Sequence, residues 1–184
     1  GKVRYLGTSN DTAYGTTKSN MICERHGYKR FESIQNNFSL LNRRFLDEMV
    51  EMCRNEKISL LPYSPMAGGV LSGKYNQDEL PRGRFSNYIK SPDERVQKMA
   101  DRFVNKNTLA STKMYMEIAD DLNIAPATLA IAWSKQFDFV ASTIIGANSV
   151  EQLYESLEAM NLQLSNETLQ RCDEVHEQIL YPMG

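Results

Sequence analysis

The chain has 184 residues, a formal net charge of −2, and 41% hydrophobic and 24% charged residues, the composition of one ordinary globular domain. This charge balance excludes a polybasic surface for nucleic acid or anionic membranes, and no apolar run approaches the roughly 20 residues that span a bilayer. The three cysteines are far apart and in no paired motif, so we expect free thiols, a cytoplasmic location and no metal site.

Three short apolar segments, each followed by a helical pattern, predict parallel strands in the first third of the chain. The segments are residues 3–7, 31–35 and 58–63, and they begin about 28 residues apart, near the length of one strand–helix unit. Helices are expected between them, over residues 11–25 and 43–55.

The rest of the chain opens with a long irregular stretch, residues 64–92, whose glycines and prolines indicate a functional or disordered loop. A fourth strand is predicted over 139–146. Five further helices are expected: after Pro92, over 111–122, from Pro126, after a cap at Ser149, and over 165–179.

The alternation of strands and helices predicts an α/β fold with right-handed crossovers. Four strands do not close a small barrel. Two architectures therefore remain open, a flavodoxin-like open sheet or part of a (β/α)8 barrel, which typically needs ~250 residues.

Polar and aromatic side chains follow the ends of all four predicted strands, at the edge where parallel α/β folds bind ligands. Amide and hydroxyl groups suit a carboxamide, and a tyrosine ring suits an aromatic one. Each position alone is equally typical of turns and helix caps, so only their coincidence at one edge favours a ligand site. The residues are Ser9, Asn10, Gln35, Tyr63, Ser64, Gly146 and Asn148.

The segment SPMAGGVLSGKY, residues 64–75, combines glycines with a lysine. Glycines let backbone N–H groups approach a pyrophosphate, and Lys74 adds a positive charge. Arg82 and Arg84 flank Gly83 further along, and an arginine pair can grip phosphate. The segment is neither a Walker A loop nor a GxGxxG motif, so a flexible solvated loop is an equal interpretation of these residues alone.

Four blocks of the sequence resemble the aldo-keto reductase superfamily, in the branch of Tas-type reductases, aryl-alcohol dehydrogenases and potassium-channel β subunits. The blocks are GKVRYLGTSN, SIQNNFSLLNR, LLPYSPMAGGVLSGKY and STIIGANSVEQLYESLEAMNLQLS. Their order and spacing match the second half of that family. The resemblance implies that residues 1–184 form strands five to eight of a (β/α)8 TIM barrel that binds NADP(H) and reduces aldehydes or ketones.

The resemblance also assigns roles along this edge. The contacts to the nicotinamide carboxamide are Ser9, Asn10 and Gln35, and the ring stacked on the nicotinamide is Tyr63. The pyrophosphate loop contributes Ser64, Met66, Gly68, Leu71, Gly73 and Lys74, and the arginine at the adenosine phosphate end is Arg84. The residues for the 2′-phosphate and adenine are Gly146, Asn148, Gln152 and Ser156. The family usually has Ser or Thr at the position of Asn148 and Asn at the position of Ser156. These two departures weaken the argument from the resemblance for NADP over NAD.

The catalytic tetrad of the family, an Asp, a Tyr, a Lys and a His, belongs to the barrel half upstream of this chain. His26 and His176 lie at helical positions remote from the predicted edge and do not replace the missing histidine. No catalytic residue is therefore expected here. The upstream tyrosine would act as general acid, and this chain would orient the cofactor.

Three explanations account for the missing half: a longer protein that was truncated or cleaved, a naturally split or short gene, or two copies that close a barrel. The start of the chain directly at a strand favours the first. The expected partners are a carbonyl substrate in the complete enzyme, together with the missing half or a second copy. The alternative function is a non-catalytic, nucleotide-binding regulatory protein, as potassium-channel β subunits are.

Overall fold

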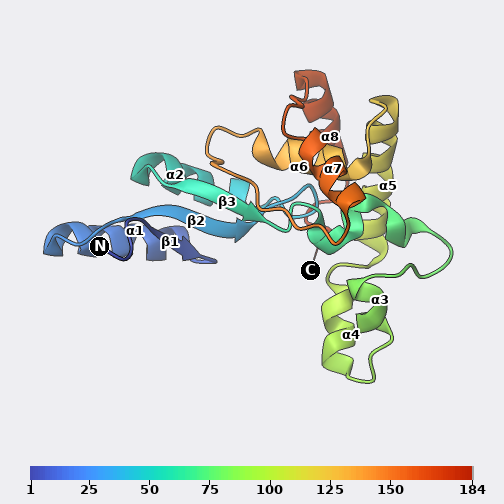
Figure 1. Ribbon diagram of the computed structural model, residues 1–184, viewed down its shortest axis with the longest axis horizontal. Coiled ribbons are helices and arrows are strands. Elements are labelled where there is room, and N and C mark those ends of the chain that lie inside the picture. Colours follow the sequence, from blue (N-terminus) through green and yellow to red (C-terminus); the bar gives the residue numbers. More distant parts are fainter. Residues whose placement is uncertain (184) are drawn as a thin grey trace.

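The computed structural model describes residues 1–183 and contains three parallel strands with helices packed beside them (Figure 1). The strands are β1 (Leu6–Ser9), β2 (Phe31–Asn37) and β3 (Ser59–Tyr63). They lie in the order β1-β2-β3, so the first three predicted strands are confirmed. β1 begins at Leu6 rather than at residue 3, because β2 provides no partner before Phe31, which lies opposite Leu6.

Apart from α3, which lies in the stretch predicted to be irregular, the helices follow the predicted positions, and capping groups set several of their boundaries. They are α1 (Ala13–His26), α2 (Met49–Glu56), α3 (Arg84–Ile89), α4 (Glu94–Asp101), α5 (Lys106–Asp121), α6 (Pro126–Lys135), α7 (Val150–Glu158) and α8 (Asn166–Gln178). α1 begins after Thr12, whose Oγ1 accepts a hydrogen bond from the Gly15 N–H at 3.0 Å. α5 begins at Lys106 rather than at residue 111, because Asn105 and Thr108 form a capping box.

The predicted helix over 43–55 is divided into a 3₁₀ turn, η1 (Arg44–Leu46), and α2. Phe45, Met49 and Cys53, which are spaced by four residues along these two pieces, are all buried in the core.

The predicted fourth strand over 139–146 does not form as a regular strand. Val140 makes a single parallel bridge with Leu60 of β3. The next ladder bond would require an N–H from Pro62, and proline has none. The Ile144 N–H instead donates to the Pro62 carbonyl at 2.8 Å. The segment therefore runs beside β3 but is bonded to it only intermittently.

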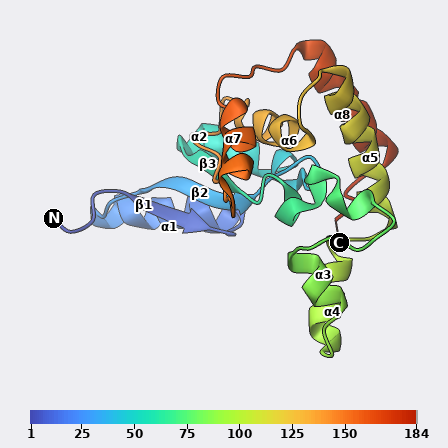
Figure 2. The same cartoon turned by 45° about the vertical axis from the view of Figure 1, so that its right-hand side comes forward.

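The predicted irregular stretch over 64–92 is largely ordered. It contains two 3₁₀ segments, η2 (Ala67–Ser72) and η3 (Lys74–Asn76), followed by α3. Residues 77–105, which include α3 and α4, form an arm that projects from the rest of the molecule (Figures 1 and 2).

The two faces of the sheet differ in what covers them. Ile34 and Leu60, on one face, are fully buried, whereas Ser33, Gln35 and Leu61 on the other are half-buried. The buried face continues into an aromatic cluster that reaches α6. Its rings belong to Phe38, Phe45, Trp133, Phe137 and Phe139. The core thus lies on one side of the sheet.

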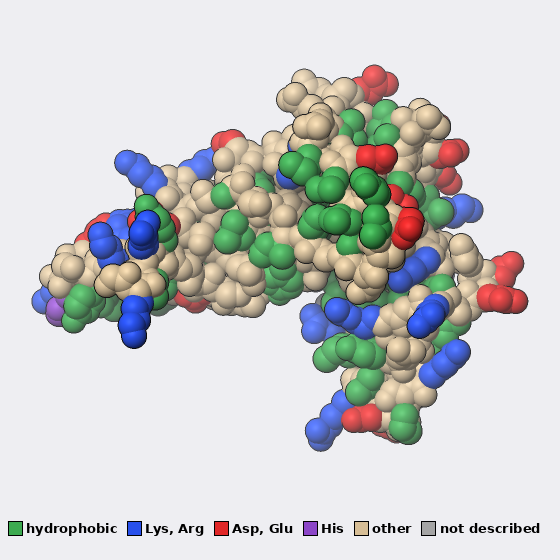
Figure 3. All heavy atoms as spheres, in the orientation of Figure 1, with side chains coloured by type: hydrophobic (Ala, Val, Ile, Leu, Met, Phe, Trp, Pro, Cys, Tyr) green, Lys and Arg blue, Asp and Glu red, His purple; other side chains and the backbone are tan. Residues whose placement is uncertain are grey.

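Two groups stand out among the large hydrophobic side chains that are exposed. One group surrounds β1 and α1 and includes Tyr5, Tyr14 and Met21; the other lies on α7 and includes Val150 and Tyr154. Figure 3 shows the second group as a patch. Among the described residues, no helix has both the length and the apolar character needed to cross a bilayer.

α8 is held to the rest of the molecule by Arg43, whose side chain is only 3% exposed. Its guanidinium donates to the Asp173 carboxylate at 2.5 Å and to the Cys172 carbonyl at 2.7 Å. The same group stacks on the Trp133 ring at 4.5 Å. A buried ion that lost these partners would be strongly destabilising, so this contact fixes the position of α8.

His176 lies one turn after Asp173 in α8, and its Nδ1 atom is buried without a hydrogen-bond partner in residues 1–183. Burial lowers the pKa of His176 below its ordinary value of 6.5. Arg43 lowers this pKa further, whereas Asp173, Asp47 and Glu177 act in the opposite direction.

The free energy of unfolding is therefore expected to fall as the pH drops below about 6.5. The unfolded chain takes up a proton at His176 before the folded chain does. The stability that the neutral imidazole contributes is thus complete above that pH and is lost below it. The measurement is urea unfolding of wild type and His176→Gln, each at about pH 7.5 and about pH 5.5. The loss of unfolding free energy between the two pH values is compared between the two proteins, because the contribution of the carboxylates that both proteins share cancels in the difference. We expect a smaller loss for the variant, and equal losses would contradict the assignment.

Candidate functional site

Four of the predicted residues meet at the carboxyl edge of the sheet. Ser9 of β1 lies opposite Gln35 of β2, and the Ser9 hydroxyl donates to the Gln35 carbonyl at 3.2 Å. The Asn10 N–H donates to the same carbonyl at 3.0 Å. Tyr63, at the end of β3, donates its hydroxyl to Asn10 Oδ1 at 2.8 Å. Residues from all three strands therefore form one network, which we call the edge network.

The edge network fixes the amide of Asn10 at both ends. Its Oδ1 accepts from Tyr63, while its Nδ2 donates to the Ser9 hydroxyl at 3.1 Å. Asn10 also has a left-handed backbone with φ of 55°, and Ser64, directly after Tyr63, has φ of 53°. Such non-glycine conformations concentrate at functional sites, where surrounding contacts maintain them.

The glycine-rich loop, residues 64–74, follows directly from Tyr63. Its turns are closed from within, because the N–H groups of Gly69 and Leu71 both donate to the Met66 carbonyl, at 2.9 and 3.2 Å. Leu71 is 1% exposed, so its side chain anchors the loop in the core, and Met66 is half-buried. Gly73 has φ of 78°. The loop is therefore a folded turn with a fixed shape.

Two cations stand beside this loop. Lys74 Nζ lies 5.2 Å from the ring centre of Tyr75 and 3.5 Å from the place that a Cβ on Gly69 would take. The same Nζ lies 2.9 Å from the corresponding position on Gly83, and the next residue, Arg84, is exposed. In the described part of the chain, neither Lys74 nor Arg84 forms an ion pair. Both are available to an anion.

The third predicted group begins at Gly146, directly after the segment that runs beside β3. Ile144 bonds to Pro62, which brings Gly146 past the end of β3. Gln152 then organises the turn into α7. Its Oε1 accepts from the Asn148 N–H at 2.9 Å, and its carbonyl accepts from the Ser156 hydroxyl at 2.8 Å. Ser156 is buried and bonded within α7, whereas Asn148 and Gln152 are exposed.

Sequence reasoning missed two residues at the loop. Gly69 has φ of 97° and faces Lys74, and the adjacent glycine pair in the sequence is a signal that could have identified it. Phe85, on α3, packs its ring against Gly68. No sequence signal pointed to this contact, because the two residues belong to separate elements.

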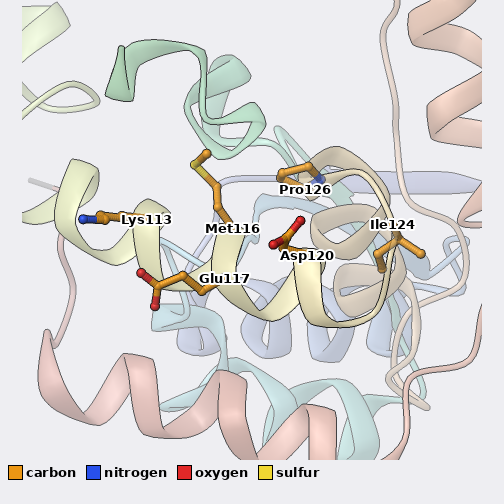
Figure 4. Close-up of a pocket in the computed structure, with 6 residues that line it drawn as sticks. All are labelled: Lys113, Met116, Glu117, Asp120, Ile124 and Pro126. Atoms are coloured by element: carbon orange, nitrogen blue, oxygen red, sulfur yellow. The ribbon is translucent and has the colours of Figure 1, made fainter. Parts of the chain in front are cut away.

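A cavity of about 320 Å³ lies elsewhere, on the outer side of α5 and at the start of α6 (Figure 4). It is lined by Lys113, Met116, Glu117, Asp120, Ile124 and Pro126. Figure 4 shows Met116 pointing from α5 toward the glycine-rich loop, and its Sδ lies 2.5 Å from the place of a Cβ on Gly73. Met116 therefore separates this cavity from the glycine-rich loop. In residues 1–183 no group of His, Cys, Asp and Glu is arranged to hold a metal ion.

The chain matches the model of the aldo/keto reductase family over residues 1–177. It is 34% identical over 186 residues to "Protein tas" of Escherichia coli, a match that covers 99% of the chain and 50% of that protein. It is 29% identical over 167 residues to the NADH-specific methylglyoxal reductase of E. coli, covering 90% and 46%. It is 28% identical over 174 residues to the versiconal hemiacetal acetate reductase of Aspergillus parasiticus, covering 95% and 48%. The chain spans about half the length of these relatives.

Proposed function

The chain belongs to the aldo/keto reductase family, and on that premise we propose that it forms the cofactor-binding half of an NADP(H)-dependent reductase of aldehydes or ketones. The observation that carries this proposal is the edge network of Ser9, Asn10, Gln35 and Tyr63, continued by a glycine-rich loop with Lys74 beside it.

The order of the strands supports half of a (β/α)8 barrel over an open flavodoxin-like sheet. Flavodoxin-like sheets place their first strands in the order 2-1-3, whereas a barrel pairs consecutive strands. Here β1, β2 and β3 are consecutive neighbours, and residues 139–146 follow beside β3. The half-buried face with Ser33, Gln35 and Leu61 corresponds to a barrel interior.

The side chains present fit a nicotinamide dinucleotide. Amides and a hydroxyl beside the Tyr63 ring suit a carboxamide on an aromatic ring. Lys74 and Arg84, which form no ion pair within residues 1–183, suit phosphates. When bound, the cofactor supplies the hydride. Ser9, Asn10 and Gln35 hold the carboxamide, and Tyr63 supports the ring.

The preference for NADP over NAD rests on the resemblance and on Arg84, an exposed cation assigned to the adenosine end, where the 2′-phosphate adds negative charge. One relative is named as NADH-specific, so the family admits both cofactors. We place the protein in the cytoplasm on its three free cysteines.

In this proposal, the proton for the carbonyl oxygen comes from the barrel half upstream of this chain. The Tyr63 hydroxyl is the only titratable group of the edge network and already donates to Asn10. His26 lies at the end of α1, and His176 lies in α8 against Tyr181. The same lack of an acid in the edge network favours a second candidate function, a regulatory protein that binds the dinucleotide without turnover.

The proposal is tested by titrating the natural full-length protein with NADPH and following cofactor fluorescence. We expect saturable binding that Gln35→Leu weakens about two- to tenfold, the value of one hydrogen bond. Gln170→Leu, an exposed glutamine on α8, is the matched control and should bind as wild type does. No binding by wild type would overturn the proposal. Binding without reduction of any aldehyde would favour the regulatory alternative.

The chain by itself is expected to associate in solution. A half-barrel has two open edges, here β1 and the segment 139–146, and exposed apolar groups lie around β1 and on α7. The missing half or a second copy of the chain would cover them. Size exclusion coupled to light scattering measures this. A monodisperse monomer of 21.0 kDa with sharp cooperative melting would contradict the half-barrel.

A further inference from the structure

The glycine-rich loop and the arm meet where Gly68 faces the ring of Phe85. Gly68 has φ of 65°, and a Cβ built on it would lie 2.7 Å from Cζ and 2.8 Å from Cε2 of Phe85. Real Cβ atoms do not approach ring carbons so closely, so the ring fills the space that a side chain on residue 68 would need. Gly68 is therefore required for packing against the arm.

Phe85 is the centre of the contact between arm and loop. Its side chain is 1% exposed and stacks on Phe103 at 4.6 Å, with Tyr75 and Tyr88 each 5.9 Å away. Its own N–H donates to the Tyr75 hydroxyl at 3.2 Å. Tyr75 belongs to η3, directly after the loop. Phe85 of α3 therefore contacts both the loop, at Gly68, and the segment that follows it, at Tyr75.

The two adjacent glycines face different partners. The open side of Gly68 faces Phe85, whereas that of Gly69 faces Lys74. Arg84 immediately precedes Phe85 in α3. The packing of the Phe85 ring therefore holds the part of the α3 backbone that carries Arg84.

We propose that Phe85 is a positioning residue, which holds the arm against Gly68 so that Arg84 and Lys74 act on the same phosphate-bearing ligand. The inference rests on the proposed function for the identity of that ligand. Its structural part, the coupling of loop and arm, has a readout that needs no ligand.

The first test compares Phe85→Leu with Tyr88→Leu in the full-length protein. Tyr88 is a matched control, because its ring touches Phe85 from the same helix but is not among the groups near Gly68. Hydrogen exchange without cofactor should be faster over residues 66–73 in Phe85→Leu only, since the N–H groups of Gly69, Leu71 and Gly73 are bonded within this loop. The KM for NADPH should rise on the order of tenfold or more in Phe85→Leu, with a smaller change in kcat. Equal effects of the two variants would overturn the role of Phe85.

The second test is a double-mutant cycle through the contact itself. Gly68→Ala should raise the KM for NADPH, because the new methyl group meets the Phe85 ring. Phe85→Leu replaces that ring with a smaller aliphatic side chain, so Gly68→Ala combined with Phe85→Leu should bind NADPH better than the product of the single effects predicts. Additive effects would contradict coupling through this contact. Failure of wild type to bind any dinucleotide would overturn the proposed function, while the hydrogen-exchange comparison would still decide whether Phe85 orders the loop.

Discussion

The 184-residue chain on its own is expected to reduce no aldehyde above background. The edge network offers amides, a serine hydroxyl and a tyrosine that is already bonded to Asn10, and it contains no free group that could protonate a carbonyl oxygen. Losing a general acid typically costs 10²–10⁴-fold in rate, and without the barrel half that would complete the substrate pocket we expect a further loss. The measurement is NADPH consumption with 4-nitrobenzaldehyde and freshly purified chain.

The control for this experiment is the same chain with Tyr63→Phe. If the chain is inactive as expected, the variant gives the same background. Turnover that survives repurification would sink the prediction. Turnover that then disappears in Tyr63→Phe would identify Tyr63 as the acid and replace its proposed role as the ring beside the nicotinamide.

Removal of either cation beside the glycine-rich loop is expected to weaken NADPH binding roughly ten- to hundredfold in the full-length protein. A hydrogen bond to a charged group contributes about 1.5–3 kcal/mol, and neither Lys74 nor Arg84 has a carboxylate partner in residues 1–183. Calorimetric titration of Lys74→Ala and Arg84→Ala with NADPH and NADH measures both affinities. We expect a larger loss for NADPH if the residue contacts the 2′-phosphate.

Lys90→Ala is the matched control, because Lys90 is an exposed lysine at the far end of α3. Equal weakening of both cofactors in Lys74→Ala would assign Lys74 to the shared pyrophosphate. If Lys74→Ala and Arg84→Ala bind both cofactors as Lys90→Ala does, Lys74 and Arg84 are solvated surface charges that do not contact the cofactor.

The elements of the fold were predictable where local chemistry determines them. The spacing of apolar segments located β1, β2 and β3. The helix predicted over 11–25 ends at His26, before Gly27, whose φ of 68° suits a glycine. The fourth strand was predicted wrongly because its composition is that of a strand, while its pairing depends on Pro62 in a different segment. Strand composition describes one segment, whereas a ladder requires donors and acceptors from two.

The candidate site shows the same division. The sequence placed Ser9, Asn10, Gln35 and Tyr63 at strand ends, which is enough to predict that they share an edge. It could not predict that the Tyr63 hydroxyl bonds to Asn10, 53 residues earlier, or that Phe85 fills the space beside Gly68. Such contacts depend on how the elements pack in three dimensions.

The anchoring of α8 by Arg43 has a consequence for the order in which the chain assembles. Ser9 and Gln35 are 26 residues apart, whereas Arg43 and Asp173 are 130 apart. By the logarithmic dependence of loop closure on length, the longer loop costs roughly 1.4 kcal/mol more chain entropy. Consecutive strand–helix units therefore have the kinetic advantage, and α8 docks onto a sheet that is already paired.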